Sequence, residues 1–144
     1  MLHRATELLA AHSIDILRIS LGVVFLAFGA LKFIPGASPA EELVVRTLQT
    51  MSFDLVSAQA AMIITAVMEC FIGVTMITGK LVKVGLLTLG AAFVGIMSPL
   101  VLFFGDLFPG APTLEAQYVF KDIVLIAAGL VVAARALGAK LVTR

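Results

Sequence analysis

Long apolar runs, each interrupted by only a few ionisable side chains, occur four times along the chain. At a helical rise of about 1.5 Å per residue, each run is long enough to cross the roughly 30 Å hydrocarbon core of a membrane. Backbone polar groups in lipid must be satisfied within their own segment, so each run is predicted to be a helix. The expected membrane spans cover residues 14–34, 55–78, 81–104 and 116–137.

The segment between the first two runs has the pattern of a short amphipathic helix. Ser38 suits an N-cap, Pro39 the first helical position and Glu41 the acid of a capping box. Apolar residues then recur at helical spacing. We therefore expect a helix at about 39–51, either lying on the membrane surface or packed over the other helices. Short turns join the later runs and no repeat is present, which predicts a single domain over residues 1–144.

Composition indicates a membrane protein. Hydrophobic residues make up 61% of the chain and charged residues 13%, whereas soluble domains carry about 25% charged residues. A globule of this length could not bury so much apolar surface. We therefore expect an all-α integral membrane protein that folds as a four-helix bundle. The formal net charge of +1 gives no reason to expect a nucleic-acid partner.

The sequence lacks the clusters that common catalytic and metal sites require. His3 and His12 both precede the first run, so they cannot hold a haem inside a bundle. No Cys/His cluster offers a metal site, and neither a phosphate-binding loop nor a catalytic-triad context is present. The single cysteine, Cys70, cannot form an intrachain disulfide. A packing role and a reactive sensor thiol both stay open for it.

Basic residues are distributed unevenly between the two ends of the expected bundle. If both termini and the turn at 79–83 share one side, that side holds seven of the ten Lys and Arg residues. The positive-inside rule then places both termini in the cytoplasm. Residues 27–29 resemble a signal-peptide cleavage site, but the long preceding stretch, with Asp15 and Arg18, argues against cleavage.

Small residues recur on one face of each expected span. Helices in lipid associate through such faces, because hydrophobicity does not distinguish lipid from protein contacts. Gly90 adds a second small face to the third span, which leaves a homo-oligomer open. The glycines expected to line the bundle interior, or simply to allow close helix packing, are Gly22, Gly29, Gly73, Gly85, Gly95 and Gly129.

Glu69 lies near the middle of the second span, where a charge is costly and is usually paired or functional. Arg18 lies about one turn inside the first span, at a depth about 7 Å from that of Glu69. A long guanidinium can extend across most of this gap. We therefore predict an Arg18–Glu69 pair, direct or through water. In the alternative, Glu69 is neutral and hydrogen-bonded to a carbonyl or to Thr65, and Arg18 lies among lipid headgroups.

A second polar cluster is expected at the opposite end of the spans. Glu115 and Asp122 lie two turns apart on nearly the same helix face, with Tyr118 between them. Lys32 ends the first span and could pair with either acid if the first and fourth spans are neighbours. Alternatively, these charges only anchor helix ends at the membrane interface. The cluster consists of Lys32, Glu115, Tyr118, Lys121 and Asp122.

Three segments together resemble the DoxX-like family of membrane proteins. Residues 16–33 are similar to the family's first helix, with Arg, Gly, an apolar run, Gly and Lys in that order. Residues 68–79 resemble its second helix, an acid followed by glycines. Residues 118–126 resemble the Lys-Asp start of the last helix in a branch that includes a reactive-chlorine resistance membrane protein. The matching positions are Arg18, Gly22, Gly29, Lys32, Glu69, Gly73, Gly79, Lys121 and Asp122.

The resemblance implies a four-helix protein of a bacterial-type inner membrane. Some relatives are small subunits of thiosulfate:quinone oxidoreductases, and others are described as oxidative-stress proteins. The first hypothesis is therefore a redox-associated subunit that contacts quinone, has no intrinsic cofactor and works with another oxidoreductase subunit. The second is a non-catalytic membrane anchor or assembly partner. The third is a small transporter or proton pathway that uses Glu69. No residue is assigned as catalytic.

Overall fold

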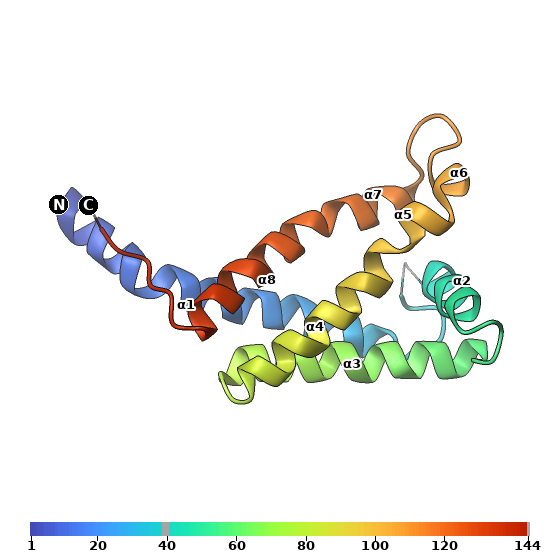
Figure 1. The fold of residues 1–144 in the computed structure, drawn as a ribbon, viewed down its shortest axis with the longest axis horizontal. Helices are drawn as coiled ribbons and strands as arrows, with labels where there is room; N and C mark the ends of the chain where they lie inside the picture. Colours follow the sequence, from blue (N-terminus) through green and yellow to red (C-terminus); the bar gives the residue numbers. More distant parts are fainter. Residues whose placement is uncertain (39–40, 144) are drawn as a thin grey trace.

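The computed structural model of the chain describes residues 1–38 and 41–143, and every regular element within these ranges is a helix. Figure 1 places the two termini at one end of the long axis and α2, α5 and α6 at the other. The helices are α1 (Leu2–Leu31), α2 (Glu41–Met51), α3 (Ala58–Thr78), α4 (Val82–Met97), α5 (Pro99–Leu102), α6 (Phe104–Leu107), α7 (Leu114–Lys121) and α8 (Ile123–Ala136).

Three helical stretches are long and apolar enough to cross a membrane, namely α1, α3 and the combined stretch of α4 and α5. They correspond to the first three predicted spans. Large apolar side chains face outward along the helices; Leu87 on α4 is 78% exposed and Leu130 on α8 is 68% exposed. Apolar exposure of this extent is unusual for a soluble monomer. These features suggest a membrane protein.

The fourth apolar run forms two helices rather than one. α7 ends at Lys121 and α8 begins at Ile123, with Asp122 between them at φ −65° and ψ −11°. The Asp122 amide donates to the Val119 carbonyl at 3.1 Å, and this i→i+3 bond tightens the turn. Figure 1 shows α8 continuing in nearly the direction of α7. Neither helix alone has the length of a membrane span.

α1 begins at Leu2, well before the start predicted for the first span. The additional residues include Ala, Leu and Glu, which favour helix, and His3 lies 3.0 Å from Glu7 one turn later. Figure 1 shows this N-terminal part extending beyond the other helices. The first apolar run is therefore only the second part of a longer helix.

Local signals explain where the other long helices begin and end. The Ser57 hydroxyl accepts a hydrogen bond from the Ala60 amide and caps the start of α3. Gly79, at φ 73°, ends α3 in the left-handed conformation that glycine adopts without strain. α4 ends at Met97, two residues before Pro99, which has no amide hydrogen to continue the helix.

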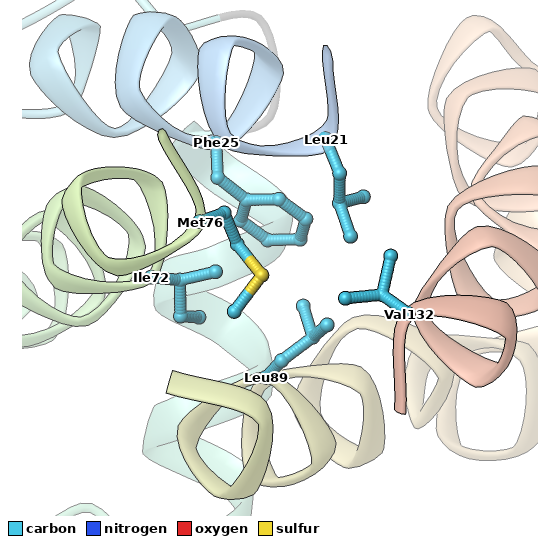
Figure 2. Packing of buried hydrophobic residues seen from close by; sticks show 6 residues of the cluster. All are labelled: Leu21, Phe25, Ile72, Met76, Leu89 and Val132. Atoms are coloured by element: carbon cyan, nitrogen blue, oxygen red, sulfur yellow. The ribbon is translucent and has the colours of Figure 1, made fainter. Parts of the chain in front are cut away.

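α1, α3, α4 and α8 share one apolar core (Figure 2). α1 contacts α3 and α8, and α4 contacts the same two helices. Phe25 on α1 packs edge-on against Phe93 on α4, with ring centroids 6.1 Å apart. The first and fourth apolar runs are therefore neighbours. The buried core residues are Leu21, Phe25, Ile72, Met76, Leu89 and Val132.

Glycines allow α1 and α3 to approach each other closely. A methyl group at Gly22 would lie 2.8 Å from the Gly73 carbonyl oxygen. One at Gly73 would lie 2.7 Å from the Leu26 amide nitrogen. One at Gly29 would lie 2.8 Å from the Glu69 β-carbon. The backbones therefore meet where side chains would not fit, as is common for helices in lipid.

The other singled-out glycines fall into two groups. Gly85 lies against the Thr75 side chain on α3, and Gly129 lies against side chains of α4. Gly95 and Gly90, in contrast, have open space where a side chain would begin. Gly95 therefore makes no close helix contact within the described residues. A contact of this face with a second copy of the chain stays a prediction.

α2 packs over the ends of the other helices, which is one of the two alternatives expected for it. It contacts α3, α4 and α5, and Leu43 is buried among residues of α6 and α7. The expected first helical residue, Pro39, lies outside the described residues. The Glu41 carboxylate accepts a hydrogen bond from the Gly36 amide at 2.8 Å, so it stabilises the preceding turn.

Candidate functional site

A buried ion pair joins α1 to α3. The Lys32 Nζ donates a hydrogen bond to the Glu69 Oε2 at 2.8 Å. The two side chains are only 6% and 8% exposed. The same ammonium lies 3.5 Å from the Phe28 carbonyl oxygen. Because both charges are buried, each depends on the other for compensation.

The close contact between α1 and α3 sets this pair. Gly29 lies against Glu69, and Lys32 is three residues further along α1 on the same face. Lys32 is also the C-cap of α1, and its amide donates to the Gly29 carbonyl at 3.1 Å. A cation at this position complements the negative end of the helix dipole. The helix register therefore places the ammonium level with the carboxylate.

The structure corrects the predicted partner of Glu69 from Arg18 to Lys32. Arg18 donates instead to the Met76 backbone carbonyl and lies beside Gly79. The reason is depth along α1, since Arg18 and Lys32 are separated by about 21 Å of helix. Glu69 is level with the Lys32 end, and the arginine interacts with the far end of α3.

The second predicted polar cluster lies around one cavity together with Glu69. One of the two alternatives paired Lys32 with an acid of the fourth apolar run; in the structure Lys32 pairs with Glu69 instead. The Lys121 ammonium lies 4.8 Å from the centre of the Tyr118 ring, a cation–π distance. The members of the cluster that line the cavity are Lys32, Glu115, Tyr118, Lys121 and Asp122.

This cavity has a volume of about 490 Å³ and is lined by residues of α1, α2, α3, α4, α5, α7 and α8, with Asp122 at the joint of the last two. Its walls are mostly apolar and include Phe28, Ile96 and Leu125. Gly95 also lines it, which accounts for the open space beside that glycine. The volume is within the range of about 300–1,000 Å³ that is typical of small-molecule sites.

α2 forms a wall that sequence reasoning did not assign to the site. Leu43 and Thr47 are one turn apart, are both buried and line the cavity. The amphipathic pattern of this helix was the available signal. Arg46 links α2 to the segment around α6, with its guanidinium 2.9 Å from the Asp106 carboxylate and 4.3 Å from the Phe103 ring centre.

We expect Arg46→Gln to lower the free energy of unfolding by at most about 1 kcal/mol, because exposed ion pairs contribute little. The two side chains are 41% and 66% exposed. Chemical unfolding in detergent measures the effect. Asp106→Asn should cause a similar loss, and the double variant should lose no more than the sum. A loss well above about 2 kcal/mol would contradict the assignment of this pair as a weak surface contact.

The arrangement combines hydrogen-bond donors and acceptors with an apolar cavity. Two lysines and three carboxylates line the cavity, so its formal charge is −1. Cys70, next to Glu69, is partly buried. Within residues 1–38 and 41–143, no group of His, Cys, Asp and Glu side chains is placed to hold a metal ion. The cavity can therefore bind a ligand with a polar head and an apolar body, and can exchange protons with it.

Comparison of the chain with protein-family models, with curated proteins and with solved structures finds no match. The DoxX-like resemblance therefore rests on the residues quoted for it. The functional interpretation rests on the cavity and its ion pair.

Proposed function

We propose that the chain is a DoxX-like four-helix protein of a bacterial-type inner membrane, and that it contacts a quinone as a redox-associated subunit. In this arrangement α7 and α8 together complete the fourth span, and both termini lie in the cytoplasm. The observation that supports the proposal most directly is the Lys32–Glu69 pair in the wall of a mostly apolar cavity.

The cavity suits the two parts of a quinone. The ring carries two carbonyl acceptors, and the Lys32 ammonium has three donors, of which Glu69 takes one and the Phe28 carbonyl a second. The third donor is therefore free for a ring carbonyl. The apolar walls, including Phe28 and Leu125, match the ring face and the start of the apolar tail.

Carboxylates beside the cavity supply a route for protons. Reduction of a quinone to a quinol takes up two electrons and two protons. Glu69 and Asp122 both line the cavity and can pass protons to the ring oxygens. We assign the electrons to a partner oxidoreductase subunit. The role of this chain is then to hold the ring, exclude water and exchange protons.

The test is binding of a short-chain ubiquinone analogue to the purified full chain in detergent, measured by titration calorimetry. We expect saturable binding by the native sequence. The double variant Lys32→Gln/Glu69→Gln keeps a neutral hydrogen-bonded pair but removes the charged donor. Hydrogen bonds to charged groups contribute about 1.5–3 kcal/mol, so affinity should fall about tenfold or more.

The matched control is Lys140→Gln/Glu7→Gln, which makes the same charge change at exposed positions outside the cavity. It should bind the analogue as the native sequence does. Tyr118→Phe, in the cavity wall, tests a further polar contact. Absence of saturable binding by the native chain would overturn the quinone proposal. The non-catalytic membrane anchor would then be the favoured function, and co-purification of a defined partner subunit would support it.

A further inference from the structure

A second cavity lies at the end of the molecule that holds the termini. It has a volume of about 510 Å³ and is formed by α1, α4 and α8, with Leu81 just before α4. It shares no lining residue with the cavity that contains the Lys32–Glu69 pair. An inference about it is therefore independent of quinone binding.

The charge of this second cavity is positive. Arg18 from α1, Lys83 from α4 and Arg135 from α8 line it, and Asp15 is the one acid among its lining residues, so the formal charge is +2. The ion pairs of the described residues involve none of these four side chains. Cations from three different helices therefore converge without full compensation, which favours an anionic ligand.

Arg18 is held in place at the wall of this cavity. It donates to the Met76 backbone carbonyl. Its Nη1 also lies close to Gly79, 3.1 Å from the point where an added β-carbon would be. A guanidinium has five N–H donors in a planar fork. The donors that Met76 leaves free can bind two oxygens of a phosphate, which is the geometry that arginine favours.

We propose that this cavity binds the phosphate headgroup of an anionic phospholipid. Apolar side chains, including Ile14, Val84 and Val132, lie beside the three cations. They suit the glycerol backbone and the first methylenes of the acyl chains, which a soluble phosphate does not have. The orientation proposed above, on which this step rests, places this end of the molecule in the cytoplasm, and basic cavities between membrane helices on that side characteristically bind such headgroups.

The experiment uses the purified full chain in a zwitterionic detergent with added phosphatidylglycerol or phosphatidylcholine, and native mass spectrometry counts the lipids retained. We expect phosphatidylglycerol to bind about tenfold more tightly than phosphatidylcholine. The double variant Lys83→Gln/Arg135→Gln removes two of the three cations and should abolish this preference. Neither side chain makes a hydrogen bond among the described residues, so the fold should persist. Should the double variant not fold, Lys83→Gln alone, at an exposed position, should weaken phosphatidylglycerol binding about fivefold.

Arg4→Gln/Lys140→Gln is the matched control, because it removes two exposed cations from the same end of the molecule but outside the cavity. It should retain the preference for phosphatidylglycerol. If this control lost the preference for phosphatidylglycerol to the same extent, general surface charge would explain the binding, and the proposed site would be wrong. Equal binding of both lipids by the native chain would also overturn it. If millimolar inorganic phosphate displaced phosphatidylglycerol, the site would be one for a soluble anion and the lipid proposal would fail.

Discussion

Lys32→Met is expected to lower the free energy of unfolding by about 3–5 kcal/mol, because it leaves a buried carboxylate without its partner. Glu69 is 8% exposed on its side chain, and its hydrogen-bond partner in the described residues is Lys32. Without the ammonium, the carboxylate would lie in the wall of a mostly apolar cavity with no cation in hydrogen-bond contact. Reversible unfolding in mixed detergent micelles, followed by circular dichroism, measures the change.

The double variant Lys32→Met/Glu69→Leu should recover most of the loss, because replacing a buried ion pair with apolar residues of similar size is often neutral. Arg46→Met is the matched control, because it breaks an exposed ion pair and should cost at most about 1 kcal/mol. If the double variant were as unstable as the single one, packing rather than charge compensation would explain the effect.

Gly73→Ala is expected to destabilise the protein by about 1–3 kcal/mol, the range for forcing extra atoms into a packed interface. The added methyl group would lie 2.7 Å from both the amide nitrogen and the β-carbon of Leu26. The Leu26 backbone cannot rotate away from the new methyl group as a flexible side chain could. Helix α1 must therefore move away from α3. That movement would also separate Lys32 from Glu69, and thermal unfolding in detergent measures the cost.

Gly90→Ala is the control for this substitution. Gly90 is in α4, and the space beside it is open. Removing a helical glycine there should stabilise the protein by up to about 1 kcal/mol, since alanine loses less backbone entropy on folding. Equal destabilisation by both substitutions would contradict the claim that the cost of Gly73→Ala comes from the close contact between α1 and α3.

Much of the candidate site could be predicted from residue type and position. A mid-span acid and charges at span ends are conspicuous because such groups are costly in lipid. The prediction of Arg18 as the partner of Glu69 is wrong, because depth from one membrane side does not define how α1 is placed along α3. The glycines indicate the correct partner. Gly22 lies against Gly73 and Gly29 lies against Glu69, and these contacts define the register of α1 on α3. That register places Lys32 at the Glu69 carboxylate.

Apolar runs with caps and breakers at their ends are local properties, so the amino-acid sequence alone was enough to predict an all-helical chain. Of the four membrane spans that it predicts, three correspond to helical stretches long and apolar enough to cross a membrane. The pairing of Lys32 with Glu69, the packing of α2 over the helix ends and the division of the last run at Asp122 were decided only in three dimensions. These features depend on how closely and at which rotation the helices approach one another. That geometry results from contacts between distant segments, and no local pattern contains it.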